Sequence, residues 1–132
     1  MQPLILYLTT AIAFLVVDMI GLRFVVKPVF DRHVGHLFAK PFRVAPAAVF
    51  YLGYVLGLLW LVSLPALADS APVTALLGGM ILGLMAYGTY EFTNYATLRD
   101  WTLEQVIVDT VWGSLLTGFA AWAGVTLTLA LA

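Results

Sequence analysis

Residues 103–131 read LEQVIVDTVWGSLLTGFAAWAGVTLTLAL, and this stretch decides the fold class. It is long enough to cross a bilayer as one helix, because a hydrocarbon core of about 30 Å needs about 20 apolar residues. Three more stretches meet this condition, at residues 3–26, 44–67 and 73–98. None shows the alternating pattern of a barrel strand. We therefore expect an all-α integral membrane protein, with residues 1–132 forming one domain that is a bundle of four transmembrane helices.

The composition excludes an ordinary soluble domain. Hydrophobic residues make up 63% of the 132 residues and charged residues only 10%, whereas a soluble chain carries about 25% charged residues. The absence of cysteine excludes disulfides, thiolate metal sites and cysteine nucleophiles. A net charge of −1 provides no basic field for nucleic acid. We therefore expect membrane lipids, and no nucleic acid, as partners.

Two short turns separate the later spans. Residues 69–72 form a turn that ends in Pro72, a residue suited to a first helical turn. Residues 99–102 form another, in which Thr102 followed by Gln105 fits a capping box. Short turns join antiparallel neighbours, so we expect spans two and three to pair, and likewise spans three and four.

The basic residues predict the orientation. Five of the six lie at the end of span one or in the connector before span two, and the sixth lies in the turn between spans three and four: Arg23, Lys27, Arg32, Lys40, Arg43 and Arg99. In a four-span protein these two regions share one side of the membrane. The positive-inside rule then places them in the cytoplasm and both termini outside it.

The connector at residues 28–41 is the only sizeable segment between spans. Its apolar residues recur at helical spacing, while Arg32, His36 and Lys40 lie on another face. This pattern predicts an amphipathic helix in the cytoplasmic interface. Such a helix would serve as a surface anchor near anionic lipid, or alternatively bind headgroups or gate a substrate.

Three acidic residues, Asp18, Glu91 and Asp109, fall inside apolar spans. A charge at mid-bilayer costs about 2.5–3.5 kcal/mol on insertion scales, so such residues usually face the bundle interior and have a function. At about 1.5 Å per residue they lie about 12, 10 and 9 Å from the cytoplasmic ends of their spans. We therefore expect the three carboxyl groups to share one level in the cytoplasmic half.

Other polar residues accompany these acids. Tyr87, Glu91 and Asn94 form one stripe of span three, and Asp109 shares a face of span four with Trp112. The remaining members of the predicted ligand-binding set flank the span-three stripe: Tyr90, Thr93 and Thr97. Arg23 and Arg99 are the nearest candidate counter-charges, unless they extend to the interface instead.

Three interpretations of these acids remain open. They can be protonated, because burial disfavours the charged form, and act only as interhelical hydrogen-bonding groups. They can pair with Arg23 and Arg99 in a structural network. They can line a polar pocket that binds a proton, a cation or a lipid-like ligand.

No metal or cofactor site is predicted. His33 and His36 are the only histidines, and both lie outside the spans. Their spacing to the acids matches no His-Glu-x-x-His or Glu-x-x-His motif. The chain has no phosphate-binding glycine loop or dinucleotide fingerprint, so the sequence does not tell whether the protein binds a cofactor.

Small residues mark helix packing. Gly53-x-x-x-Gly57 and Gly79-x-x-x-Gly83 allow close approach of helices, and span four carries a similar ridge that includes Gly113 and Gly124. We expect these ridges to pack within the monomer, and a homodimer through one of them is the alternative.

The stretch Tyr90-Glu91-Phe92-Thr93-Asn94-Tyr95-Ala96-Thr97-Leu98, followed by Trp101, resembles the signature of a family of small bacterial membrane proteins. That family is known as a domain of unknown function (number twenty-one seventy-seven). Residues 108–113 resemble its second signature, and Asp18 matches an aspartate of its first span. The chain departs from the pattern in this span, because the family commonly has a tryptophan at the position of Gly21 or Ile20.

The resemblance implies a multi-pass protein of the bacterial inner membrane, but no particular reaction. It also implies that certain residues belong to the family motifs: Glu91, Thr93, Asn94, Thr97, Asp109 and Trp112. Members resemble products of gene clusters for lipid modification and oxidative stress, an association only.

Three functions compete. The first is a module that binds a proton, a cation or the polar part of a lipid-like molecule through the acids, Asn94 and the tyrosines. The second is a membrane enzyme or accessory subunit in lipid modification, with Glu91 or Asp109 as general acid–base. The third is a structural or assembly factor without a ligand.

Overall fold

The computed structural model describes residues 1–132, and they form four long helical rods. The first rod is continuous from Gln2 to Leu37 and contains α1 (Gln2–Gly21), a π-helical segment (Leu22–Val26), α2 (Lys27–Val34) and a short 3₁₀ turn (Gly35–Leu37). The second contains α3 (Val44–Leu58), a π-helical segment (Leu59–Ser63) and α4 (Leu64–Ala68). The third and fourth are α5 (Pro72–Thr97) and α6 (Leu103–Leu131). All four are long and apolar enough to cross a membrane, which confirms the predicted all-α, four-span class.

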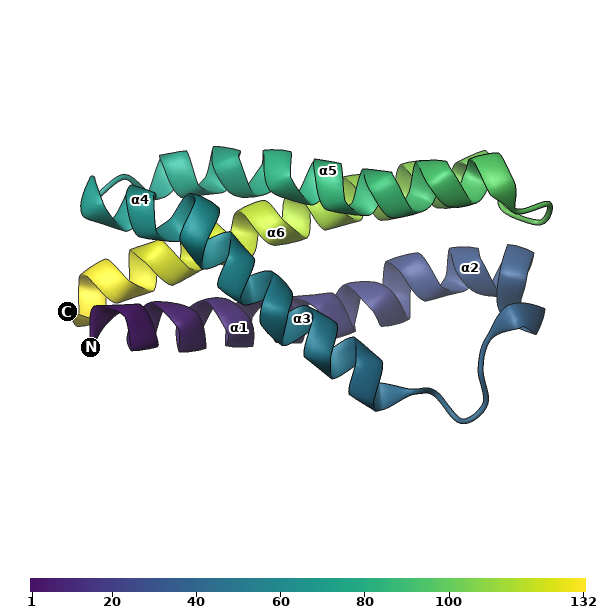
Figure 1. Ribbon diagram of the computed structural model, residues 1–132, viewed down its shortest axis with the longest axis horizontal. Coiled ribbons are helices and arrows are strands. Elements are labelled where there is room, and N and C mark those ends of the chain that lie inside the picture. The colour runs from purple at the N-terminus through teal and green to yellow at the C-terminus, as the bar shows by residue number, and fades with distance from the viewer.

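The loops and termini divide between the two ends of the bundle. Figure 1 shows both termini and the α4–α5 turn at one end, with the α5–α6 turn and the segment after α2 at the other. The second end also holds the basic residues of α2, the following segment and Arg99. We call it the basic end.

Helix α6 is the centre of the bundle. Half of the residues (50%) in the apolar stretch of α6 are buried inside the bundle, compared with 22% of those in the apolar stretch of Val44–Ala68. Helix α5 packs along α6 at very short range, because a Cβ atom on Gly79 would lie 2.8 Å from the Thr117 carbonyl oxygen. The predicted antiparallel pairing of spans three and four, and the internal packing of their small residues, are therefore confirmed.

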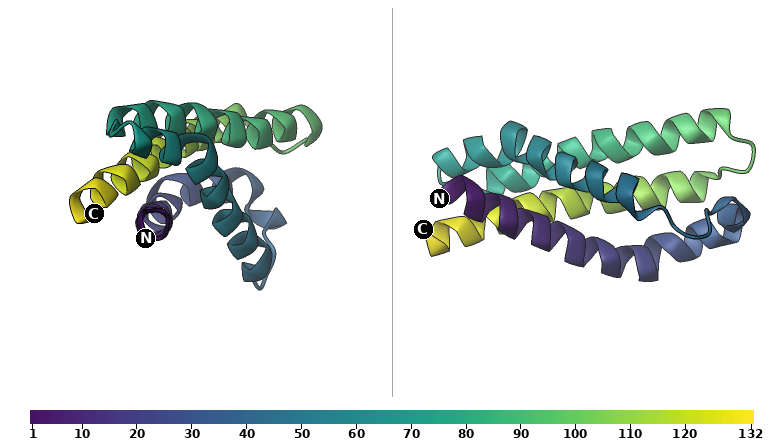
Figure 2. Two further views of the ribbon diagram at one scale, coloured as in Figure 1. Left: turned by 60° about the vertical axis from the view of Figure 1, so that its left-hand side comes forward. Right: turned by 60° about the horizontal axis from the view of Figure 1, so that its bottom comes forward.

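The second rod pairs with the third over only part of its length. The π-helical segment Leu59–Ser63 and α4 contact α5, whereas α3 leans across the bundle and contacts α1. Figure 2 shows α3 diverging from the other helices toward the basic end. The expected pairing of spans two and three is thus correct only near their turn. A Cβ atom on Gly53 or Gly57 would meet no atom within 4 Å, so this ridge does not pack within the monomer as expected.

A separate interfacial helix at residues 28–41 is not confirmed. Residues 27–37 instead continue the first rod, and residues 38–43 that follow are not helical. Val29 and Val34 of this extension are buried, and Val34 packs against Trp101 and Val106 near the start of α6. Of the apolar residues that predicted a membrane-surface helix, Phe30 and Val34 therefore contact protein, whereas Leu37 and Phe38 remain exposed.

The predicted capping box at the start of α6 is confirmed. The Thr102 hydroxyl accepts a hydrogen bond from the Gln105 backbone N–H, and Gln105 Oε1 accepts one from the Thr102 N–H at 2.9 Å. Pro72 lies in the first turn of α5, also as predicted. Pro72 therefore marks the start of α5, and the capping box marks the start of α6.

Candidate functional site

The antiparallel contact of α5 and α6 determines which residues face each other. Gly83 approaches Gly113 and Thr117, and one turn further along α5 Tyr87 lies against Gly113. One more turn along α5, and one turn back along α6, places Glu91 opposite Asp109. This register results from the glycines, which let the two backbones come close enough for short acidic side chains to meet.

Glu91 and Asp109 form a buried carboxyl pair. Glu91 has 0% of its surface exposed and Asp109 has 7%. Their carboxyl groups lie within hydrogen-bonding contact across the α5–α6 interface. A carboxylate carries no donor, so two carboxyl groups form a hydrogen bond only when one of them is protonated. The arrangement is therefore suited to hold a proton.

The indole of Trp101 fixes Glu91. Its Nε1 donates a hydrogen bond to Glu91 Oε1 at 2.9 Å, within buried surroundings. The other oxygen, Oε2, is buried and receives no hydrogen bond from any N–H or hydroxyl group. Because Oε1 is occupied as an acceptor, Oε2 is the oxygen of Glu91 that is free to carry a proton.

Asp18 is the third buried acid and lies beside Asp109. It accepts a hydrogen bond from Trp112 Nε1 at 3.2 Å, and the Tyr51 side chain lies nearby. Trp112 reaches Asp18 because it packs on Gly21 of α1, where a Cβ atom would overlap its ring. The structure thus brings the three acids of α1, α5 and α6 into one neighbourhood.

Tyr87 lies between the acids and the middle of the bundle. Its ring covers the α-carbon of Gly113 and lies 6.4 Å from the Tyr54 ring, edge to face. It is within electrostatic range of Asp18 and Asp109. The Tyr54 hydroxyl in turn forms a 3.0 Å hydrogen bond with the Thr117 hydroxyl of α6.

Comparison with known protein families gives one match. The family model described as a predicted membrane protein, DUF2177, matches residues 3–126. The chain belongs to the DUF2177 family. No curated protein and no solved structure matches it.

The residues that we expected to belong to the family motifs divide between the inside and outside of the bundle. Glu91, Asp109 and Trp112 point inward, as described above. Thr93 and Thr97 are exposed, and their hydroxyls donate to the carbonyl oxygens of Thr89 and Thr93 in their own helix. We expected both threonines to line a binding pocket, but they lie on the outside of the bundle. Their hydroxyl groups form hydrogen bonds within their own helix and therefore need no partner in the interior.

Tyr90 and Asn94 lie at the edge of the site. Tyr90 is 53% exposed, and its ring is packed edge to face with the Trp101 ring at a centroid distance of 5.7 Å. Asn94 is half-buried. Tyr90 therefore borders the tryptophan that fixes Glu91, and neither Tyr90 nor Asn94 contributes a group to the carboxyl pair itself.

The expected counter-charges do not pair with the acids. The Arg23 guanidinium lies over the Phe24 ring, and the Arg99 side chain is 95% exposed and nearest to Asp100. Both follow the alternative that arginines near span ends extend toward the interface. The carboxyl pair is left without a cationic neighbour, which excludes the structural ion network.

Three residues that the sequence did not single out lie in or near the site: Tyr51, Asp100 and Glu104. Tyr51 contacts Asp18, and Glu104 binds Arg32 and His33 of α2 at the basic end. His36 binds Asp100 at 3.1 Å. No group of three or more histidine and acidic residues is arranged to hold a metal ion. In the sequence, only the i, i+4 spacing of Asp100 and Glu104 indicated that these two acids could bind basic residues on one surface.

The prominent hollows of the molecule lie elsewhere. One, of about 440 Å³, is an open apolar groove that includes Gly53 and Gly57 of α3. The other, of about 340 Å³, runs between Val25 and α6 and touches Trp112. Neither is lined by a carboxyl group, so neither provides the polar ligand pocket that the sequence predicted.

Proposed function

We propose that this DUF2177 protein binds and releases a proton at the Glu91–Asp109 pair within the membrane. The observation that carries the proposal is the contact of two buried carboxyl groups that have no cationic side chain beside them. Two like charges so close together in a low-dielectric site repel strongly, so one proton shared between them is the stable arrangement. The proton is the ligand that best fits the chemistry of this pair.

The other ligands that the sequence left open fit less well. A metal ion needs several oxygen or nitrogen ligands around one point, and here only two carboxyl groups meet directly. A lipid headgroup needs a polar hollow, whereas the two prominent hollows are apolar. A proton needs neither, because it occupies the hydrogen bond between the acids.

Trp101 and Asp109 define the bound state. The indole N–H occupies Oε1 of Glu91, so a proton on Oε2 is placed to hydrogen-bond with Asp109. Loss of this proton would leave two negative charges in contact, and their repulsion would push the α5 and α6 side chains apart. Proton binding is thereby linked to the packing of the two central helices.

We further propose that the basic end faces the cytoplasm of a bacterium, with both termini on the other side of its inner membrane. All six lysine and arginine residues precede or flank the two loops at that end, which supports this orientation. The carboxyl pair then lies in the cytoplasmic half of the bilayer.

Infrared spectroscopy of the purified protein in lipid nanodiscs tests proton binding. A buried protonated carboxyl group has a C=O absorption separate from that of a carboxylate. We expect this absorption at neutral pH, and we expect it to change in Glu91→Gln and Asp109→Asn. Glutamine at residue 91 keeps a hydrogen-bond donor toward Asp109, which favours correct folding.

Asp69→Asn is the matched control, because Asp69 is an exposed acid of the α4–α5 turn. Its spectrum in this region should equal that of the unmodified protein. A spectrum without any protonated acid at neutral pH would refute the proposal and leave the carboxyl pair as a structural contact only. An absorption that is unchanged in both Glu91→Gln and Asp109→Asn would also refute it.

A further inference from the structure

Helix α2 covers the side of the carboxyl pair that faces the basic end. Trp101 donates to Glu91 on one side, and on the other its ring meets the Phe30 ring edge to face at 5.4 Å. Val34 packs beside it against Trp101 and Val106. Trp101 therefore lies between Glu91 and α2, and only 8% of its surface is exposed.

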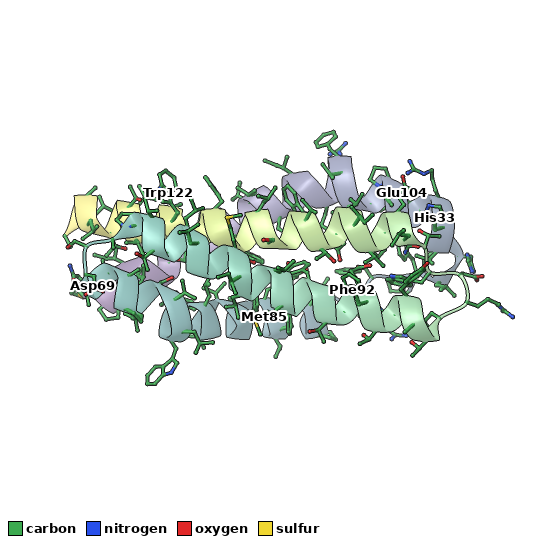
Figure 3. All side chains as sticks on the ribbon, turned by 90° about the horizontal axis from the view of Figure 1, so that it is seen from above. His33, Asp69, Met85, Phe92, Glu104 and Trp122 are labelled. Atoms are coloured by element: carbon green, nitrogen blue, oxygen red, sulfur yellow. The ribbon has the colours of Figure 1, made fainter.

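Polar contacts hold α2 in this place. Glu104 at the start of α6 accepts from Arg32 Nη2 at 2.9 Å and contacts His33 Nε2 at 2.8 Å. His36 contacts Asp100 at 3.1 Å. Figure 3 shows His33 and Glu104 together at one end of the molecule, with Asp69 at the other. These polar contacts are largely solvent-exposed, and exposed contacts between such side chains contribute little stability each. We call these contacts of Glu104 and Asp100 with the α2 region the clasp, and little free energy is needed to break them.

Both ends of α2 permit movement. The π-helical segment Leu22–Val26 joins it to α1, and such segments interrupt the regular hydrogen bonds of a helix and often mark functional sites. After α2, residues 38–43 are exposed and make no helix. Helix α2 is therefore attached to the bundle mainly through its own contacts with α6 and Trp101.

We propose that α2 is a hinged cap that controls access of water to the Glu91–Asp109 pair from the basic end. This inference rests on the proposed proton-binding function and adds its control. When the clasp on Glu104 and Asp100 opens, α2 swings at residues 22–26, Phe30 and Val34 leave Trp101, and protons exchange with bulk water. When the clasp closes, exchange stops.

Hydrogen–deuterium exchange at the carboxyl pair measures this access. The chain has no cysteine, so a His33→Cys/Glu104→Cys variant offers one pair of thiols, which a short methanethiosulfonate crosslinker joins reversibly. After transfer to heavy water, the shift of the protonated-acid absorption gives the exchange rate. We expect the crosslinked protein to exchange at least about tenfold more slowly than the same protein after reduction, because local opening sets the rate.

A second variant opens the cap without new thiols. Glu104→Ala removes the carboxylate that holds both Arg32 and His33, so exchange should become faster. Asp31→Ala is its matched control, because Asp31 pairs only with Lys27 of its own helix, and should leave the rate unchanged. A crosslinker on an Asp69→Cys/Val73→Cys pair at the opposite end controls for the reagent itself.

The outcomes separate the two proposals. If the protonated-acid absorption is present but its exchange rate is the same with and without the crosslink, the cap is refuted and proton binding stands. If Glu104→Ala and Asp31→Ala exchange at equal rates, the clasp has no role and the cap is again refuted. If no protonated acid exists, proton binding fails and the cap fails with it.

Discussion

The ring of Tyr87 lies on the α-carbon of Gly113, in the space that a side chain on Gly113 would occupy. This contact sets the register that puts Glu91 opposite Asp109 one turn away. We therefore predict that Gly113→Ala destabilises the protein by about 1–3 kcal/mol, the usual cost of overpacking a core. Thermal unfolding in detergent micelles, followed by circular dichroism, measures the change.

Gly53→Ala is the control for this prediction. A Cβ atom at Gly53 meets nothing within 4 Å, and alanine is the better helix former. This variant should be neutral or slightly stabilising. Equal damage from both substitutions would mean that helix flexibility, and not the Tyr87 contact, makes glycine necessary.

Trp101→Phe tests the hydrogen bond to Glu91. Phenylalanine keeps an aromatic ring near Phe30 and Tyr90 but removes the N–H donor, which leaves a buried carboxyl oxygen unpaired. We expect a loss of about 1–3 kcal/mol in the free energy of unfolding. Trp122→Phe should cost less, because the Trp122 indole is 37% exposed and makes no hydrogen bond with the protein. A smaller effect at residue 101 than at residue 122 would contradict the role of the indole.

Threonine-to-valine substitutions separate the two faces of the polar helices. Thr93→Val and Thr97→Val should each change stability by less than about 0.5 kcal/mol, because both residues are exposed. Thr117→Val should cost about 1 kcal/mol, because it removes the buried partner of the Tyr54 hydroxyl. A Thr93→Val variant as unstable as Thr117→Val would show that the outer face of α5 has a partner of its own.

The Arg32–Glu104 pair should be weak and sensitive to salt. A double-mutant cycle with Arg32→Ala and Glu104→Ala should give a coupling of about 0.2–1 kcal/mol, as for other exposed pairs. Added salt should reduce it, since exposed charges are screened. A strong coupling that salt does not change would indicate a clasp too tight for the proposed cap.

Much of the fold was predictable because span length is set by the bilayer. The bounds of spans two to four agree with the structure within one residue. The continuation of the first rod was not predictable, because Pro28 normally ends a helix. Here the π-helical segment ends at Val26, so Pro28 lies in the first turn of a new helical segment, where its missing N–H is tolerated.

The site was predictable in its acids and less so in their surroundings. Acids in an apolar span must avoid lipid, so Asp18, Glu91 and Asp109 turn inward. A threonine hydroxyl can instead bond to its own helix, so the polar character of Thr93 and Thr97 gives no direction. Tyr51 was missed because α3 is apolar on all sides, and no periodic pattern marks the face that meets Asp18.

The central place of α6 has a consequence for how the protein is made. The three other rods pack around a helix that follows them all in the chain, so they leave the ribosome before their common partner exists. Until residues 103–131 are synthesised and inserted, Asp18 and Glu91 face lipid or the translocation machinery without their neighbours on α6. The bundle can therefore assemble only after residues 103–131 have been inserted into the membrane.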